Sequence, residues 1–214
     1  MKKEFKSRPA CFDGKEMYGF DWKEHVLTIP SPLAVVTSYK AGGRTNATMQ
    51  SWMTFANSDG FYCIFGDVNI NGHMYKTIKE TKACVINFPS AEVYGRCYST
   101  ISHNGDDEDE ISAAGLTAED GSIVKAPRIA ECFLNLECEY AWERELSPGS
   151  RHTVLCVRVV NVVMDEEHYD AGRKGRYGDS GYLYNIHSPV NPETGEEEQT
   201  FVAAISKLAV YDEL

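Results

Sequence analysis

The sequence has no run of about 18 apolar residues, the length that a membrane-spanning helix needs. The N-terminal residues Met1–Lys6 lack the apolar core of a secretory signal, so we expect a cytoplasmic protein that does not enter a membrane. The motifs G-x-S-x-G, H-E-x-x-H, G-x-G-x-x-G and the Walker loop are also absent. These absences exclude the hydrolases, zinc proteases and dinucleotide-binding folds that carry such motifs.

Basic side chains are few compared with acidic ones. The 214 residues include 21 Lys and Arg against 32 Asp and Glu, a formal net charge of −11 at pH 7. A field of this sign repels phosphate polymers and anionic lipid, so nucleic acid and membrane surfaces are not expected as partners. Small molecules or other proteins are the partners that we expect.

Cysteines are present, but not in spacings that carry function. The chain has seven, an odd number, with no C-x-x-C pair and no zinc-ribbon spacing, which argues against a disulfide framework and against a metal site. Cys63, Cys84 and Cys156 lie in apolar, strand-like runs, where cysteine packs as a small buried hydrophobe. Cys132 and Cys138 are an even number of residues apart and would share one face of a strand, so we assign both to the core.

What the sequence does contain is a series of β-branched and aromatic runs separated by turn residues. An apolar content of 43% over 214 residues can form one large core, so we expect a single domain over residues 1–214. Strands are predicted at Leu33–Tyr39, Thr45–Phe55, Phe61–Phe65, Ala83–Phe88, Leu134–Arg144 and His152–Met164. The run Phe61–Phe65 is continuously apolar, which predicts burial on both faces.

Two helices are predicted between these strands, at residues 72–82 and 90–101. Residues 172–200 lose periodicity and accumulate Gly, Pro, Asn and Glu, which indicates an exposed excursion before the apolar stretch from Phe201. Strands joined by short turns, with helices inserted rather than alternating, predict a mainly β fold. The expected architecture is a closed antiparallel barrel with a few peripheral helices.

An acidic run interrupts the middle of the chain, with five consecutive carboxylates at Asp106–Glu110. No glycine-centred EF-hand pattern surrounds it, so a solvated loop is a better interpretation than a calcium site.

The charge distribution nevertheless leaves one region suited to a small anion. Residues 30–82 carry +2, so the rest of the chain carries −13. Within this region Asn46–Thr54 is dense in small hydrogen-bonding side chains, which can hold a polar heterocycle. Lys76 and Thr77 near the start of the next helix add charge, a hydroxyl and a helix dipole, which together suit a mononucleotide with one phosphate. The alternative is that these polar groups make ordinary barrel hydrogen bonds and that Lys76 is a solvated surface residue.

Several short stretches occur in a characteristic order. In the first half they are Pro32–Thr37, Gly43–Thr48, Ser51-Trp52, His73–Thr81 and Val85–Pro89. In the second half they are Ala114–Thr117 (A-G-L-T), Lys125–Pro127 (K-A-P), Glu131–Cys138 (E-C-x-x-N-L-E-C) and His152–Val163. In this order the stretches, which span residues 30–170, resemble the flavin reductase-like, flavoredoxin-type family.

The resemblance implies an FMN-binding split β-barrel, antiparallel and of Greek-key type, that assembles as a homodimer with the flavin near the subunit interface. Residues 46–52 would line the isoalloxazine ring and ribityl chain, and residues in the following helix would surround the phosphate. The cofactor-binding residues implied are Asn46, Ala47, Thr48, Met49, Gln50, Ser51, Trp52, His73, Tyr75, Lys76 and Thr77.

Two departures from the family pattern concern this site. Asp59-Gly60-Phe61 stands where many relatives have a Pro-Pro pair. His73 and Tyr75 stand where an arginine and a serine are common, and a histidine does not reproduce the bidentate fork of an arginine. The phosphate contacts are therefore expected to differ from those of the family.

In such a protein the flavin carries the redox chemistry, so no dedicated acid or base is required and no catalytic residue is assigned. The predicted function is electron transfer between NAD(P)H or a protein donor and flavin, with FMN as cofactor. The protein would act either as an NAD(P)H:flavin oxidoreductase or as a flavoredoxin-like electron carrier. The alternative is a non-catalytic protein that uses the same barrel to bind flavin or another small ligand, or only to dimerise.

Overall fold

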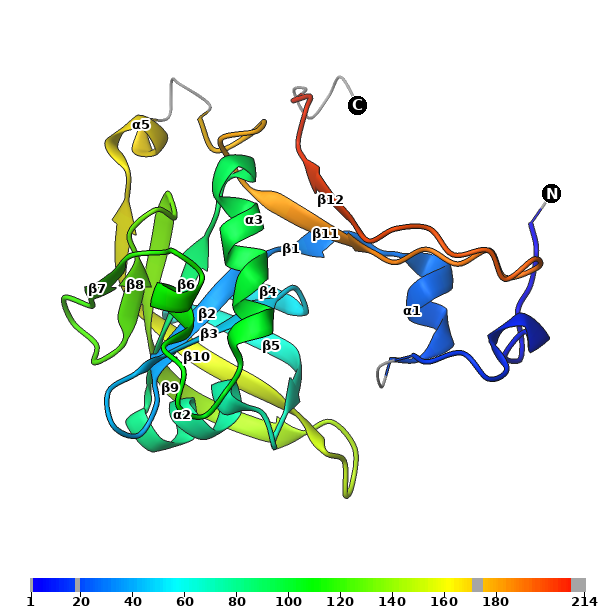
Figure 1. The fold of residues 1–214 in the computed structure, drawn as a ribbon, viewed down its shortest axis with the longest axis horizontal. Coiled ribbons are helices and arrows are strands. Elements are labelled where there is room, and N and C mark those ends of the chain that lie inside the picture. The colour runs from blue at the N-terminus through cyan, green and yellow to red at the C-terminus, as the bar shows by residue number, and fades with distance from the viewer. Residues whose placement is uncertain (1, 18–19, 171–174, 209–214) are drawn as a thin grey trace. The chain divides into compact units, whose positions relative to one another are not determined.

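The computed structural model describes residues 2–17, 20–170 and 175–208 (Figure 1). The chain divides into two compact units. Unit 1 comprises Met1–Ser31 and Tyr184–Ala203, and unit 2 comprises Pro32–Leu183 and Ala204–Leu214. That the whole chain folds as a single domain stays a prediction.

Unit 2 is built on a seven-stranded sheet with the order β3-β2-β6-β9-β10-β5-β4, in which every neighbouring pair is antiparallel. β3 and β4 are the two edge strands, yet only Ser51 and Trp52 join them along the chain. The sheet must therefore curl until its edges meet at that link, which confirms the predicted split antiparallel barrel. The strands are β2 (Ala34–Tyr39), β3 (Thr45–Gln50), β4 (Met53–Asn57), β5 (Phe61–Asn69), β6 (Ala83–Phe88), β9 (Leu134–Glu145) and β10 (His152–Met164).

Helices cover the barrel in two different ways. α2 (His73–Thr81) buries Met74 and Ile78 in the interior core together with Phe65. α3 (Ala91–Ser99) lies across the outer side of β2 and β3 and packs Val93 against Val35 in a second core (Figure 1). The remaining elements of unit 2 are η2 (Thr100–His103), α4 (Glu110–Ala113), α5 (Glu166–Tyr169) and the hairpin β7 (Ala118–Asp120)–β8 (Pro127–Ile129).

The predicted strands and helices are confirmed with small shifts, apart from two details. The strand expected over Thr45–Phe55 breaks at Ser51 and Trp52, where the chain passes from one edge of the sheet to the other. Two-sided burial of Phe61–Phe65 is wrong. Cys63 and Phe65 are fully buried while Tyr62 and Ile64 are only half-buried, because β5 presents alternate residues to the core, and Phe61 at the start of the strand is 40% exposed.

The cysteines of the barrel are core residues, as predicted. Cys63, Cys84 and Cys138 lie in the interior core, while Cys97 and Cys132 lie in the outer one. Cys132 precedes β9, so it does not share a strand face with Cys138. Burial raises the pKa of Cys63, Cys132 and Cys138, which keeps these thiols protonated.

Unit 1 contains two short helical segments and most of a small sheet. Its elements are η1 (Ala10–Phe12), α1 (Trp22–Leu27), and strands of the sheet β1-β11-β12, with β1 (Ser31–Pro32), β11 (Leu183–His187) and β12 (Phe201–Ala204). Of the predicted excursion at 172–200, residues 172–174 lie outside the described residues. The expectation that it is exposed throughout is wrong, because Leu183 and Val190 are buried and β11 pairs within the sheet.

An acid–imidazole contact lies inside unit 1. Glu24 Oε1 of α1 is 2.5 Å from His187 Nδ1 of β11, and the two side chains are 13% and 9% exposed. Burial raises the pKa of Glu24 to about 7 and lowers the pKa of His187. Both groups are therefore driven toward their neutral forms.

Candidate functional site

A pocket of about 240 Å³ lies in unit 2 where the end of β3 faces the start of α2. β3 contributes Ala47, Thr48, Met49 and Gln50, and α2 contributes His73. These five residues belong to the predicted cofactor-binding set, so the structure brings the polar strand and the helix start together around one cavity. The rest of the lining consists of Val68, Asn69, Gly72, Met74, Thr100, Ile101 and Asn104.

The outer edge of β3 is capped over part of its length. Thr45 N–H donates to Asp109 Oδ2 at 3.2 Å, and Ala47 N–H donates to Glu110 Oε2 at 2.7 Å. Because every second residue of an edge strand directs its backbone groups outward, Met49 presents the next outward N–H and C=O, and Met49 lines the pocket. The edge is therefore held by carboxylates up to residue 47 and is open to a ligand at residue 49.

The inner face of β3 carries an unusual buried amide. Asn46 is fully buried and its Nδ2 donates to Thr48 Oγ1 at 3.2 Å. Asn46 Oδ1 has no hydrogen-bond partner among the described residues, which is costly for a buried acceptor unless a donor from outside the chain is supplied.

The start of α2 forms the opposite wall. Gly72 is the N-cap and offers no side-chain cap, so the first-turn amides of α2 lack the acceptor that most helices provide. His73 Nε2–H donates to Asp106 Oδ1 at 2.8 Å, and its Nδ1 lies 3.7 Å from Glu110 Oε1. The helix dipole makes this end of the pocket favourable to an anion.

The acidic run proves to be an anchored loop. Lys40 Nζ, on a side chain only 7% exposed, lies 2.7 Å from Gly105 O, 3.0 Å from Glu108 O and 2.8 Å from Glu110 Oε1. The prediction of a solvated loop holds for residues 106–108 but is wrong for Asp109 and Glu110. Asp109 caps α4, and Glu110 is 1% exposed, because both carboxylates satisfy amides of β3 that would otherwise be unpaired.

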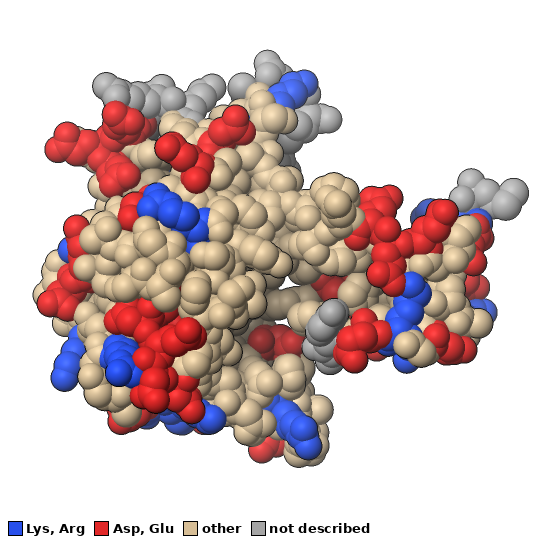
Figure 2. Space-filling model, viewed as in Figure 1, with Lys and Arg blue, Asp and Glu red and all other residues tan. Residues whose placement is uncertain are grey.

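This loop also changes the charge of the region. Arg44 pairs with Asp107 at 2.8 Å and Lys40 pairs with Glu110, so the loop neutralises two cations of the +2 segment. Figure 2 shows acidic clusters with Lys and Arg at their margins rather than a broad basic field. The electropositive character expected for this region is therefore reduced to the start of α2 and to the exposed side chain of Lys76.

Other predicted residues do not line the pocket. Tyr75 O–H donates to Glu143 Oε1 on β9 at 3.2 Å, and Thr77 Oγ1 lies 2.6 Å from Ser38 Oγ inside the barrel. Ser51 and Trp52 form the link between the edge strands, where the Trp52 carbonyl accepts from Gly66 N–H at 2.7 Å.

A histidine on the neighbouring wall has a carboxylate partner. His152 begins β10 and lies opposite Asn69 of β5, which lines the pocket. Its Nδ1 is 2.5 Å from Asp67 Oδ1. The pair fixes the orientation of the imidazole beside the β5 wall.

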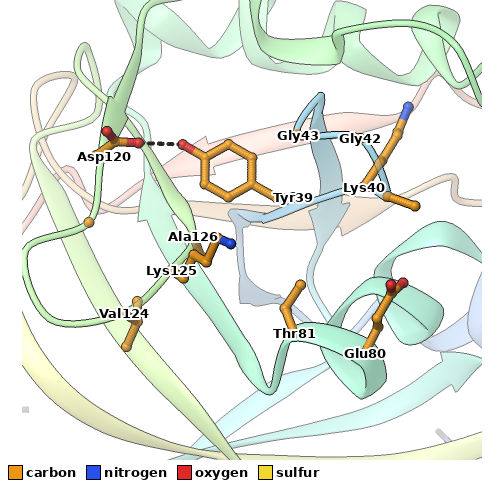
Figure 3. Close-up of a pocket in the computed structure, with 12 residues that line it drawn as sticks. Tyr39, Lys40, Gly42, Gly43, Glu80, Thr81, Asp120, Val124, Lys125 and Ala126 are labelled. Atoms are coloured by element: carbon orange, nitrogen blue, oxygen red, sulfur yellow. Dashed lines mark hydrogen bonds between the residues drawn. The ribbon is translucent and has the colours of Figure 1, made fainter.

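A second hollow, of about 730 Å³, lies at the other end of α2 (Figure 3). Tyr39 and Asp120 point toward each other across one side, joined by a 2.6 Å hydrogen bond, while Glu80 and Lys125 lie around the rim. Burial, with the hydrogen bond to Asp120, raises the pKa of Tyr39 to about 12. The hollow contains charges of both signs and none of the predicted site residues.

The E-C-x-x-N-L-E-C stretch serves the fold. Glu137 is fully buried and accepts from the N–H groups of Ser122 at 2.9 Å, Ile123 at 2.7 Å and Val124 at 3.2 Å. Burial opposes its ionisation, but these donors more than offset that effect, and the pKa of Glu137 lies below its usual range. Asn135 Nδ2 donates to Asn87 Oδ1 at 2.9 Å and so links β9 to β6.

Comparison with known sequences decides the family. The profile of the flavin reductase like domain matches residues 26–185 of the chain. The chain belongs to the flavin reductase-like family. Family membership relates the protein to flavin-dependent oxidoreductases, which confirms the resemblance drawn from the sequence motifs.

Both a sequence relative and solved structures are similar to this flavin reductase-like protein, and the solved structures share its fold. An uncharacterized protein of Aquifex aeolicus (strain VF5) is 27% identical over 169 residues, covering 73% of this chain and 85% of the relative. The crystal structure of nitrilotriacetate monooxygenase component B from Bacillus cereus has a TM-score of 0.73 at 17% identity, with 92% and 97% of the two chains covered. Flavoredoxin of Desulfovibrio vulgaris (Miyazaki F) has a TM-score of 0.67 at 19% identity, with 98% and 96% covered.

In the part of the chain that the structure describes, no helix has the length and apolarity to cross a membrane. Among those same residues, no group of three or more His, Cys, Asp or Glu side chains is arranged to hold a metal ion.

Sequence reasoning missed several residues that shape this flavin reductase-like site. Lys40, Asp106 and Glu110 were not predicted, because an acidic run indicates a solvated loop and their partners lie tens of residues away along the chain. One local signal was available. Asp109 followed by Ser112 is an N-cap pattern, and it predicts a helix that would draw Glu110 toward the protein.

Proposed function

We propose that this flavin reductase-like protein binds FMN between β3 and α2 and transfers electrons between NAD(P)H or a protein donor and flavin. The observation that carries the proposal is the open edge of β3 at Met49, which faces a pocket closed on its other side by the uncapped start of α2. The first feature suits the hydrogen-bonding edge of a flavin ring, and the second suits its phosphate.

The residues present fit such a ligand. A bound flavin would supply the redox chemistry, while the chain positions it and excludes water. The backbone of Met49 would orient the ring. Asn46 does not line the pocket, so a bridging water rather than the ligand itself would satisfy its buried Oδ1. The exposed Ile101 would shield the apolar side of the pocket.

The size of the pocket bears on assembly. Its volume of about 240 Å³ is below the range of about 300–1,000 Å³ common for small-molecule sites. One chain would enclose only part of a flavin mononucleotide, so we propose that a second copy of the chain completes the site in a homodimer. Analytical ultracentrifugation with and without FMN tests this, and a monomer with bound FMN contradicts it.

Flavin binding is tested by recording the visible spectrum of the purified protein during titration with FMN. We expect saturable binding, and no uptake at micromolar concentration contradicts the proposal. The variant Lys76→Ala removes the exposed cation early in α2 and should weaken FMN binding about fivefold. Lys82→Ala is the matched control, since Lys82 lies at the C-cap of the same helix and its loss should change the affinity by less than about twofold.

A second assay separates the enzyme from the carrier. Sustained oxidation of NADH or NADPH with excess free flavin indicates a reductase, whereas a tightly held flavin that only a protein donor reduces indicates a flavoredoxin-like carrier. A third outcome, flavin binding without reduction by either donor, supports a non-catalytic binding protein. The contact of Asp106 with His73 favours the form of this second candidate in which the barrel holds a small ligand other than FMN, because it places an anion where the phosphate of FMN would lie.

A further inference from the structure

One exposed carboxylate lies directly against the wall of the flavin pocket. The side chain of Asp106 is 94% exposed, and its Oδ1 lies 2.8 Å from His73 Nε2, on a residue that lines the pocket. Asn104, two residues earlier, also lines the pocket. The loop that carries Asp106 is held in place by Lys40, which contacts the carbonyls of Gly105 and Glu108 on either side of it.

We propose that Asp106 is a specificity-determining residue that weakens the binding of flavins with a phosphate at this end of the pocket, so that FMN binds less tightly than the start of α2 alone would allow. The inference rests on the proposed function, because it concerns the same pocket. Asp106 occupies, on His73 and beside the first turn of α2, the position that an anionic group of a ligand would take.

Among the neighbouring charged groups, Asp106 is the one expected to affect an anion in the pocket most. Glu110 also faces His73, at 3.7 Å, but Lys40 lies 2.8 Å from the same oxygen and neutralises it. Asp107 is turned away onto Arg44. Among the described residues, the basic group that contacts the carboxylate of Asp106 is the imidazole of His73, so its charge acts on an anion that approaches His73.

The strength of this effect follows from the exposure of the pair. A solvent-exposed contact of this kind contributes little to stability, so a ligand can displace Asp106 from His73 at small cost. The repulsion remains, because the anchored loop keeps the carboxylate within a few ångströms of a phosphate that carries almost two negative charges. At such distances near a protein surface, removal of one charge changes the affinity for that phosphate about tenfold.

The experiment compares two ligands and two variants. FMN and riboflavin share the isoalloxazine ring and ribityl chain and differ only in the phosphate. Asp106→Asn and Asp107→Asn each remove one charge from the same loop, one residue apart, and both side chains are exposed, so both variants should fold. Affinities come from titrations followed by flavin fluorescence, with melting temperatures as the check on folding.

We expect Asp106→Asn to bind FMN about tenfold more tightly than the wild type and to bind riboflavin within about twofold of it. Asp107→Asn should leave both affinities within about twofold. The gain for Asp106→Asn should shrink at about 1 M salt, where charges are screened beyond about 3 Å.

Three outcomes overturn the inference. Equal gains in FMN affinity for the two variants would show a general charge effect of the loop. Equal gains for FMN and riboflavin in Asp106→Asn would show a change in the shape of the pocket. Unchanged FMN affinity in Asp106→Asn would show that the carboxylate does not act on the phosphate. If neither flavin binds any of the three proteins, the proposed function itself fails, and this inference fails with it.

Discussion

Two buried carboxylates, Glu137 and Glu110, make similar contacts in different parts of the barrel. Each accepts hydrogen bonds from backbone N–H groups that lack a partner in the sheet. Glu137 accepts from three consecutive amides and from Asn161, and Arg128 Nη1 lies 3.7 Å from its Oε1. Glu110 accepts from one amide, pairs with Lys40 and lies beside the histidine of the pocket.

The difference separates a structural acid from one that shapes a site. A carboxylate surrounded by amide donors is stabilised as an anion wherever it is buried, so Glu137 depends mainly on its amide donors, and its cation Arg128 lies 3.7 Å away, against 2.8 Å for Lys40 beside Glu110. A carboxylate with a single amide donor relies on a lysine, and the strand that it caps remains open two residues further along. The number of backbone donors therefore distinguishes the two roles.

The largest expected effect comes from Glu137→Gln. The amide group would place an N–H donor against backbone N–H donors, so the free energy of unfolding should fall by about 3 kcal/mol, as measured by urea denaturation. Glu139→Gln, two residues along β9 in an exposed pair with Arg158, is the control and should cost less than about 0.5 kcal/mol. Equal losses in the two variants would show that the donors around Glu137 add nothing.

For Glu110→Gln we expect the free energy of unfolding to fall by a smaller amount, about 2 kcal/mol, because Lys40 keeps its two carbonyl contacts but loses its anion. A double-mutant cycle with Lys40→Met measures the coupling within the pair by urea denaturation. Unlike Glu137→Gln, the Glu110 variant should also weaken FMN binding by the folded protein, since the edge of β3 loses an anchor beside the pocket. Unchanged FMN affinity would remove the distinction between the two acids.

The smallest effect concerns Glu24 in unit 1, where burial raises the pKa and no amide donor or lysine of the described residues is seen to offset it. Its pKa is raised from 4.5 to about 7, so the folded state holds this proton more tightly than the unfolded chain does. The resulting stabilisation is fully present below pH 4.5 and is lost as the pH rises through about 7. We expect a loss of about 1 kcal/mol, since the contact with His187 offsets part of the burial.

Hydrogen exchange of the α1 amides at pH 5 and pH 8, corrected for intrinsic rates, measures this loss. In Glu24→Gln, which cannot ionise, the difference between the two pH values should disappear. An unchanged difference would assign the effect to another group. An effect of His187 would have the opposite pH dependence, because its lowered pKa removes stability as the pH falls rather than as it rises.

The strands and the barrel could be predicted from the sequence because the relevant signals are local. β-branched runs, Gly-rich turns and the apolar spacing of α2 each lie within about ten residues, and periodicity detects such patterns. The strand half of the pocket was predictable for the same reason, since the polar residues Thr48 and Gln50 alternate with the apolar Ala47 and Met49 along the strand.

The other half of the site depends on contacts that no local pattern reports. The partners of Lys40 and Ala47 lie in the acidic run, more than sixty residues away, and charge alone indicates solvent for that run. Thr77 was placed at the pocket by the helix start and Tyr75 by the family resemblance, but the side chain of Thr77 enters the barrel beside Ser38 and that of Tyr75 reaches β9. The core that a short helix covers decides which face of the helix is buried.

The carboxylate cap on β3 has a consequence for solubility. An edge strand with free backbone groups is a template on which another chain can add a strand, and such edges promote aggregation. Asp109 and Glu110 occupy those groups at Thr45 and Ala47 with charges that repel a second strand. At Met49 the backbone groups of β3 are left open. A ligand can bind at this stretch, and when no ligand is bound, the same stretch is the part of the strand most exposed to β-strand addition.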